Sequence, residues 1–225
     1  MGSKPEMSLT WLLDFDDTLA SAPLTWAVTH ALPRMIAENG LPADPVRLNA
    51  ALMHGQQLSN QNTEPQVVLD SFFARMGWPA HLKKPLLQTI YADYQPALFT
   101  DVLPFLMAIR RHGDLALVVS NNPRAPQIAE KLGLVEYVYA VYTPQLCGSC
   151  RPKPDGSLWD YIRQQHHGLD QTQVRMIGDD PWSDGAFARQ CGIRCWLLDR
   201  FDRFQGVPAT DGFEVVRSLA EIEHD

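Results

Sequence analysis

The chain has 225 residues, of which 45% are hydrophobic and 20% are charged, and its formal net charge is −7. This composition is typical of a globular protein that is long enough for one core domain and a sizeable insertion. The negative charge and the lack of a basic stretch argue against nucleic-acid binding, and the apolar runs are too short to span a membrane. Four cysteines do not predict a disulfide scaffold, so we expect a cytoplasmic protein.

The first apolar run of the chain ends in a cluster of acidic residues. Residues 9–13 are expected to form a buried strand, and the run Asp14-Phe15-Asp16-Asp17-Thr18 follows it directly. In open α/β sheets, ligands bind at the carboxyl ends of the strands. Because neighbouring carboxylates repel each other unless a cation or a proton relieves the charge, this run predicts a metal-assisted site.

The stretch from about residue 21 to residue 100 contains no convincing strand. It holds four helical candidates, at residues 24–38, 45–53, 65–76 and 82–94, separated by segments that contain glycine or proline. One of these segments, residues 55–63, is expected to be a polar loop. We therefore predict an inserted helical domain over residues 21–100 and a core domain formed by residues 1–20 and 101–225.

After the insertion, helical patterns alternate with short apolar runs. Strands are expected at residues 115–120, 137–142, 174–177 and 195–198, and helices at residues 102–112, 126–132, 158–166 and 184–191. Strands that alternate with helices indicate βαβ units and a parallel sheet. The predicted fold class is therefore α/β, with a parallel-sheet core and an inserted all-helical domain.

Polar residues that suit phosphoryl transfer follow these strands or lie in the loops between them. Ser120 closes the second strand, Lys153 precedes a helix, and Asp179 and Asp184 follow the run at 174–177. A parallel sheet brings such positions together at one edge. Phosphoryl transfer depends mainly on positioning and on charge stabilisation, which Ser120 and Lys153 would provide.

The acidic residues suggest more specific roles. Asp14 is a candidate nucleophile of the kind that forms an aspartyl-phosphate, and Asp16 is a candidate general acid and base. Asp14 and Asp179 are candidate ligands of Mg²⁺, which binds to a few carboxylates, to water and to substrate phosphate.

Taken in order, these residues resemble the four motifs of the haloacid dehalogenase-like hydrolase superfamily. The run Asp14-Phe15-Asp16-Asp17-Thr18-Leu19 is similar to the first motif, and Ser120 and Lys153 match the second and third. Gly178-Asp179, with Asp184 five residues after Asp179, matches the fourth. One such motif would be weak evidence, whereas four in the family's order are specific.

The resemblance implies a Rossmann-like core in which the helical insertion is a cap domain of the family's first type. It also implies dependence on Mg²⁺ and a phosphorylated intermediate on Asp14. The backbone carbonyl of Asp16 would be a further metal ligand beside Asp179 and Asp184. Thr18 would help to orient Asp16.

Asp16 distinguishes between the activities of this superfamily. Dehalogenases and phosphonate hydrolases resemble a pattern without an acid at this position, so Asp16 favours hydrolysis of a small phosphorylated metabolite. A phosphomutase or phosphotransferase would use the same intermediate, and a non-catalytic binding module on this fold is a third possibility. The substrate and the oligomeric state cannot be read from the sequence.

Several assignments stay open in the sequence. Either Asp180 or Asp184 could be the second acid of the fourth motif, although the spacing favours Asp184. Asn121, and His54 in the polar loop of the insertion, are candidate substrate-binding residues.

The cysteines leave a further question open. Cys147 and Cys150 form a C-x-x-C sequence that could be a redox pair or part of a zinc site. Cys191 and Cys195 are expected to be small core residues, which disfavours a four-cysteine zinc site.

Overall fold

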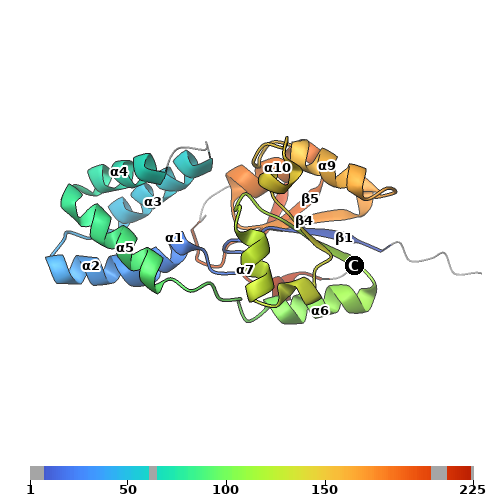
Figure 1. Cartoon of the computed structure of the whole chain (residues 1–225), viewed down its shortest axis with the longest axis horizontal. Coiled ribbons are helices and arrows are strands. Elements are labelled where there is room, and N and C mark those ends of the chain that lie inside the picture. Colours follow the sequence, from blue (N-terminus) through green and yellow to red (C-terminus); the bar gives the residue numbers. More distant parts are fainter. Residues whose placement is uncertain (1–7, 61–64, 204–211, 224–225) are drawn as a thin grey trace, which may run out of the picture. The chain divides into compact units, whose positions relative to one another are not determined.

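The computed structural model describes residues 8–60, 65–203 and 212–223. It contains two compact units, shown in Figure 1. The α/β unit comprises Met1–Ser21 and Ala97–Asp225, and the helical unit comprises Ala22–Pro96.

A parallel six-stranded sheet forms the centre of the α/β unit, in the order β3-β2-β1-β4-β5-β6. The strands are β1 (Thr10–Leu13), β2 (Leu115–Val119), β3 (Ala140–Tyr142), β4 (Val174–Gly178), β5 (Arg194–Leu198) and β6 (Phe213–Val216). The main helices are α6 (Val102–His112), α7 (Ala125–Lys131), α9 (Ser157–Gln165) and α10 (Ala186–Cys191). This architecture confirms the predicted α/β, Rossmann-like fold class.

Both faces of the sheet are buried, which explains why its strands are continuous apolar runs. Side chains alternate along β1, so Trp11 and Leu13 enter one hydrophobic cluster and Leu12 enters the other. Residues of α6 and α7 complete the first cluster and residues of α9 and α10 the second, and Figure 1 shows the two pairs of helices on opposite faces.

Three details of the α/β unit differ from the sequence-based expectation. The strand expected at 137–142 begins only at Ala140, because the amides of Tyr137 and Val138 donate to the carbonyl oxygen of Leu134 in a turn. The helix expected at 184–191 is preceded by a π-helical turn, Pro181–Gly185. Strand β6 was not predicted, since its two central residues are exposed and its apolar pattern is short.

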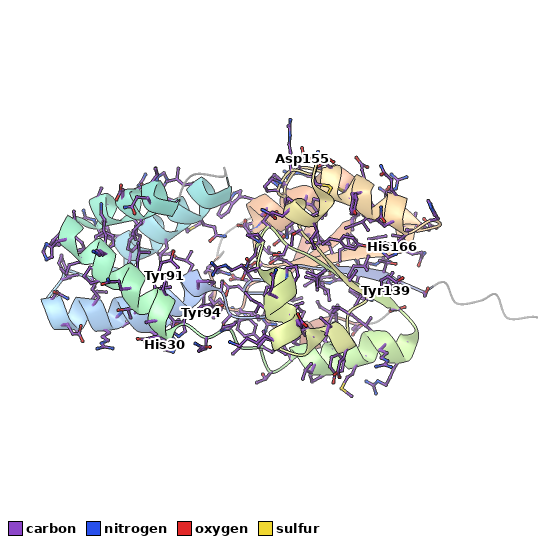
Figure 2. The ribbon with its side chains drawn as sticks, in the orientation of Figure 1. His30, Tyr91, Tyr94, Tyr139, Asp155 and His166 are labelled. Atoms are coloured by element: carbon purple, nitrogen blue, oxygen red, sulfur yellow. A yellow bond between two sulfur atoms is a disulfide. The ribbon has the colours of Figure 1, made fainter. Side chains whose placement is uncertain are left out.

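Strand β3 lies at an edge of the sheet, where aromatic residues contact one another. The hydroxyl of Tyr142 lies 2.7 Å from Nε2 of His166, and the ring of Tyr139 lies 5.4 Å from the His166 ring. Tyr139 and His166 are labelled in Figure 2. The segment that follows α9 therefore contacts this edge strand through side chains.

The described part of the helical unit contains no strand. Its helices are α1 (Pro23–Trp26), the π-helical turn Ala27–Ala31, α2 (Leu32–Asn39), α3 (Pro45–Asn60), α4 (Pro65–Met76) and α5 (Lys83–Asp93). Phe72, Phe73 and Trp78 make edge-to-face contacts with centroid distances of 5.6 to 6.0 Å. The indole Nε1 of Trp78 donates to the carbonyl oxygen of Pro42 at 2.9 Å, so this aromatic core is also fixed by a hydrogen bond.

The polar loop expected at residues 55–63 was predicted wrongly in its first part. Helix α3 continues to Asn60, which places His54 and Gly55 inside the helix, while residues 61–63 lie outside the described residues. Glutamine and leucine are good helix formers, and Gly55 faces Val68 of α4 at close range. Packing between the two helices therefore outweighs the helix-breaking tendency of one glycine.

None of the helices in the described ranges is long and apolar enough to cross a membrane.

Candidate active site

The candidate site lies where the three central strands of the sheet end. Strands β2, β1 and β4 are neighbours, and Ser120, Asp14 and Asp179 directly follow them. The amide of Asp14 donates to the carbonyl oxygen of Ile177, which extends the β1–β4 pairing up to the acidic run. The sheet therefore brings together side chains that are far apart in the sequence.

Lys153 lies at the centre of the site and is buried, with 1% of its surface exposed. Its Nζ donates to Asp14 Oδ1 and Asp184 Oδ1, both at 2.5 Å, and to the carbonyl oxygen of Val119 at 2.8 Å. The side chain of Asn121 holds the backbone of Lys153, because it accepts from the Lys153 amide at 2.7 Å and donates to the Lys153 carbonyl oxygen at 3.0 Å. The ammonium group is thus directed at two carboxylates by a fixed backbone.

Asp184 reaches this cluster because the π-helical turn folds back over the end of β4. A Cβ atom on Gly178 would overlap the Asp184 carboxylate, so only glycine allows this close approach. Asp180 has a different place, since its Oδ1 accepts from the amides of Trp182 and Ser183 and begins the turn. The geometry therefore places Asp184 in the acidic cluster and Asp180 at a helix start.

Asp16 lies two residues beyond Asp14 and has its own partner. Nδ2 of Asn122 donates to both carboxylate oxygens of Asp16, at 2.9 and 3.2 Å. Burial raises the pKa of Asp16 to about 6, although the hydrogen bond from Asn122 opposes this shift. A carboxyl group with such a pKa can both give and take a proton near neutral pH.

Ser120 and Thr18 are both buried beside these groups. The hydroxyl of Ser120 accepts from the amide of Asn122 at 3.0 Å. Thr18 Oγ1 has no hydrogen-bond partner among the described residues, so a hydrogen bond that orients Asp16 is not part of this structure.

The cluster carries more negative than positive charge, and its pKa values reflect this. Burial raises the pKa of Asp14 to about 6, against the opposing effect of Lys153. Burial and the charge of Asp14 raise the pKa of Asp184 to about 7, and burial raises that of Asp179 well above its usual value. Burial alone would lower the pKa of Lys153, but Asp14 and Asp184 outweigh it and raise the pKa. A further cation or proton would therefore stabilise the cluster.

The residues of this cluster fit a divalent metal ion. Asp14, Asp179 and Asp184 are buried, and each offers a carboxylate oxygen within 4.8 Å of the others. An all-oxygen set with few protein ligands is the kind that Mg²⁺ prefers. The donor set and the excess negative charge both agree with the expected Mg²⁺ site.

Arg203 is a cation at this site that the sequence-based reading missed. Its Nη2 donates to Asp179 Oδ2 at 2.6 Å, and its Nη1 lies 3.3 Å from Asp17 Oδ2. Asp17 has φ 55°, a backbone conformation that favours glycine. Asp17 lies in the loop after β1, and Arg203 lies five residues after β5 ends at Leu198, so no local pattern in the sequence pairs them.

The structure brings together most of the predicted site residues. Seven of them belong to the α/β unit and follow its strands or lie in its loops and turns: Asp14, Asp16, Thr18, Ser120, Lys153, Asp179 and Asp184. Arg151, two residues before Lys153, is exposed. The side chain of Asn121 is occupied by the backbone of Lys153, and His54 lies on α3 of the helical unit. Asn122, which sequence reasoning passed over, is the residue that binds Asp16.

Solved structures with a similar fold cover nearly the whole chain. A HAD family hydrolase from Deinococcus radiodurans R1, with bound phosphate and sodium, has 21% identity and a TM-score of 0.68 over 95% of this chain and 93% of its own. The proposed HAD-hydrolase YfnB from Bacillus subtilis, bound to magnesium, has 16% identity and a TM-score of 0.66 over 95% and 96%. A HAD phosphatase from Thermococcus onnurineus has 19% identity and a TM-score of 0.58 over 95% of each chain. At these identities, the similarity shows the fold.

Sequence comparison identifies the family. No curated protein matches the chain. The model of the haloacid dehalogenase-like hydrolases, however, matches residues 10–192, which include the ends of β1, β2 and β4 and the loop that carries Lys153. The chain therefore belongs to the haloacid dehalogenase-like hydrolase family.

Proposed function

We propose that this protein is a Mg²⁺-dependent phosphatase that hydrolyses a small phosphate ester through an aspartyl-phosphate on Asp14. The observation that carries the proposal is the pairing of two carboxyl groups with different surroundings. Asp14 is bound to Lys153 in the acidic cluster, and Asp16, two residues on, accepts from the neutral amide of Asn122 and has a raised pKa. The first arrangement suits a nucleophile and the second a general acid.

In the first step, a carboxylate oxygen of Asp14 attacks the phosphorus atom and the bond to the ester oxygen breaks. Protonated Asp16 gives its proton to the departing oxygen, which leaves as an alcohol. Lys153 keeps the Asp14 side chain in place and adds positive charge beside the transferring group. Ser120 lies at the end of the neighbouring strand and is proposed to orient that group.

In the second step, Asp16 is a carboxylate and takes a proton from water. The water oxygen attacks the phosphorus atom of the aspartyl-phosphate, whose acyl-phosphate bond breaks. Inorganic phosphate leaves, Asp14 is a carboxylate again, and Asp16 is protonated for the next cycle. Asn122 holds Asp16 through both steps.

Asp14, Asp179, Asp184 and the backbone carbonyl of Asp16 are the proposed ligands of Mg²⁺. When bound, the ion would neutralise charge on the phosphoryl group and orient it. Arg203 limits the freedom of Asp179 by holding its second oxygen, so that this residue is presented in one orientation.

The helical domain at residues 21–100 is proposed to act as the cap that selects the substrate, with His54 as a candidate contact. The expected substrate is a small phosphorylated metabolite of the cytoplasm. The phosphate bound to the D. radiodurans relative and the phosphatase from T. onnurineus support this proposal, because both share the fold.

Turnover of p-nitrophenyl phosphate tests the mechanism. We expect activity that requires Mg²⁺ and that Asp14→Asn abolishes. Asp160→Asn is a matched control, since Asp160 is exposed on α9 and should leave turnover unchanged. Full activity of Asp14→Asn would contradict the mechanism.

A second experiment separates a phosphatase from a mutase. It measures the release of inorganic phosphate from sugar phosphates against phosphoryl transfer to a second sugar.

A further inference from the structure

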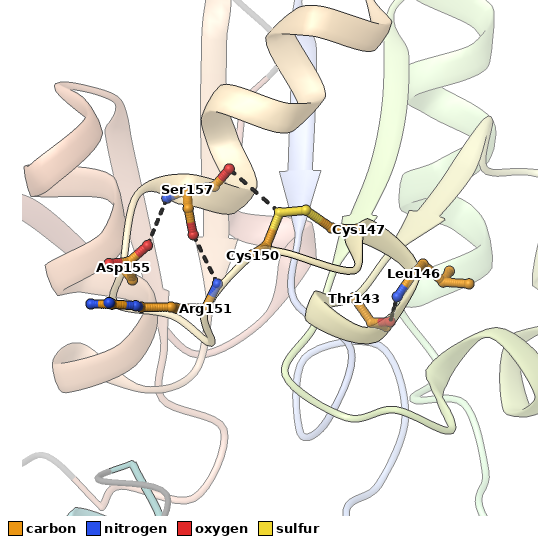
Figure 3. Close-up of a disulfide and its surroundings, with 7 residues drawn as sticks. All are labelled: Thr143, Leu146, Cys147, Cys150, Arg151, Asp155 and Ser157. Atoms are coloured by element: carbon orange, nitrogen blue, oxygen red, sulfur yellow. Dashed lines mark hydrogen bonds between the residues drawn. A yellow bond between two sulfur atoms is a disulfide. The ribbon is translucent and has the colours of Figure 1, made fainter.

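The C-x-x-C sequence forms a disulfide that lies close to Lys153 along the chain. Cys147 ends the short helix α8 (Pro144–Cys147), and its disulfide to Cys150 joins Cα atoms 5.5 Å apart (Figure 3). Lys153 follows three residues later. The disulfide therefore sets the start of the loop that carries the central lysine of the candidate site.

Hydrogen bonds fix the rest of this loop to the start of α9. The amide of Arg151 donates to the Ser157 hydroxyl, and the amide of Ser157 donates to Asp155 Oδ1, both at 2.9 Å (Figure 3). On the other side of the disulfide, Thr143 begins α8 by accepting from the amide of Leu146. The loop is thus held by hydrogen bonds at its α9 end and at Lys153, whose backbone is bound to Asn121. At its α8 end, the disulfide adds a covalent bond that can be opened.

Cys147 and Cys150 are placed for thiol–disulfide exchange, whereas Cys191 and Cys195 are not. Cys147 and Cys150 are half-buried, and Gly148 and Ser149 between them are exposed. Burial raises the pKa of Cys191 to about 12 and also raises that of buried Cys195. Because Gly148 and Ser149 are exposed, a small dithiol reductant can reach the Cys147–Cys150 disulfide from the solvent, whereas buried Cys195 is shielded.

In the reduced state, the Cys150 thiol has a hydrogen-bond acceptor within reach. The sulfur of Cys150 lies 3.6 Å from the carbonyl oxygen of Ser157, which is within the range of a sulfur hydrogen bond. A disulfide sulfur has no proton to donate, whereas a thiol has one. Reduction would therefore replace the covalent bond by a weak hydrogen bond to α9, and the segment would not lose all its contacts.

We propose that Cys147 and Cys150 are a reversible redox site whose disulfide holds the Lys153 loop in place. A thiolate of a dithiol reductant attacks one of the two sulfurs, the disulfide breaks, and a mixed disulfide forms. The second thiol of the reductant then attacks that mixed disulfide. Two electrons pass to the protein, which ends with two thiols, and the reductant ends as its own disulfide. In reducing compartments, disulfides that form at all are mostly transient or redox-sensing.

The first measurements need no enzyme activity. The folded protein is equilibrated in mixtures of reduced and oxidised dithiothreitol and alkylated, and its mass is measured by mass spectrometry. Amide hydrogen exchange is followed in peptides that cover residues 148–157. We expect two alkyl groups to appear reversibly as the reductant fraction rises, and faster exchange in those peptides. The Cys147→Ser variant should show the fast exchange in both conditions, and Cys191→Ser should behave like the unaltered protein.

The effect on Lys153 is measured by turnover, and this part rests on the proposed function. We expect a lower kcat in the reduced protein, by up to about 100-fold, because small displacements of positioning groups reduce rates strongly. A pair that stays unreactive in the folded protein, or that is reduced with no change in exchange or kcat, would overturn the proposal. If neither form turns over phosphate esters while alkylation and exchange behave as expected, the redox site stands and the phosphatase proposal fails.

Discussion

The interiors of the two units differ in the charge that they bury. In the α/β unit, Asp14, Asp179, Asp184 and Lys153 are all buried at one edge of the sheet. In the described part of the helical unit, the buried residues are all apolar, and its ion pairs Arg34–Glu38 and Lys83–Asp70 lie at the surface.

Buried charge is the feature that distinguishes the α/β unit. Removing charges from water is unfavourable, so a cluster of buried carboxylates with raised pKa values weakens the fold unless it has another use. The helical unit contains no such cluster among its described residues, and its buried core is apolar. The two units should therefore respond in opposite ways to matched substitutions.

The largest effect is expected from Lys153→Met. Without the ammonium group, Asp14 and Asp184 are buried without their shared cation, which should lower the free energy of unfolding by about 3–5 kcal/mol at neutral pH. Urea unfolding without divalent cations measures this, and p-nitrophenyl phosphate turnover should be lost as well. Lys83→Met, at the exposed pair with Asp70, is the matched control and should change little. Equal losses in both variants would remove the distinction between the units.

Phe73→Ala tests whether packing alone holds the helical unit. Phe73 is 1% exposed and contacts Phe72 and Trp78, so its removal leaves a cavity and should lower the free energy of unfolding by about 3–5 kcal/mol. Urea unfolding followed by circular dichroism measures the free energy of unfolding of both proteins. A loss below about 1 kcal/mol would show that this core is loosely packed.

Asp101→Asn tests a half-buried charge of the α/β unit outside the acidic cluster. Asp101 accepts from Arg200 at 2.8 Å through both oxygens, and from Ser218 and Leu219. Burial would raise the pKa of Asp101, but these donors outweigh it and lower the pKa below 3.8. Its stabilising contribution is therefore complete well above pH 4 and is lost as the pH falls through the lowered value.

The Asp101→Asn protein should be less stable than the unaltered protein by about 1.5–3 kcal/mol at pH 7. The difference should shrink on acidification below about pH 4, where the unaltered protein also becomes protonated. Urea unfolding at several pH values measures both. A difference that stays constant down to pH 2 would mean that the carboxylate charge contributes nothing.

Gly178→Ala tests how closely Asp184 packs against the end of β4. The added Cβ would overlap the Asp184 carboxylate, so the side chain or the backbone must shift. We expect a loss of about 1–3 kcal/mol in the free energy of unfolding, and weaker Mg²⁺ binding by titration calorimetry. Unchanged stability together with unchanged Mg²⁺ binding would contradict the close approach.

Gly55→Ala, in the helical unit, should have the smallest effect and the opposite sign. Its Cβ would lie 3.5 Å from Val68 Cγ1, which is an ordinary contact, and it would face a cavity of about 260 Å³ lined by Leu52, Phe72 and Ile90. Alanine should stabilise the middle of α3 by roughly 0.5–1 kcal/mol. Thermal unfolding compares the Gly55→Ala protein with the Gly178→Ala protein. A loss of stability in Gly55→Ala would show that α3 and α4 are too close for a methyl group.

Local patterns in the sequence were sufficient for most strands and for the acidic run. The strand ending at Leu13 and the acids that follow it are adjacent in the chain, so the continuous apolar run and the strand-end rule find them together. The same reasoning failed for residues 54–60, where contact with α4 outweighs the local preference for a loop. It also missed β6, because the two central residues of this strand are exposed and its apolar pattern is short.

Short-range patterns in the chain were sufficient to predict the fold class, the order of the motifs and the residues of the acidic cluster. How those residues are held became visible only in the folded chain. Asn122 binds Asp16, Asn121 holds the backbone of Lys153, and Arg203 binds Asp179, all through hydrogen bonds between different loops. Such bonds join residues that are 24 to 106 positions apart, and their free energy depends on distance in space, which no local pattern of the chain records.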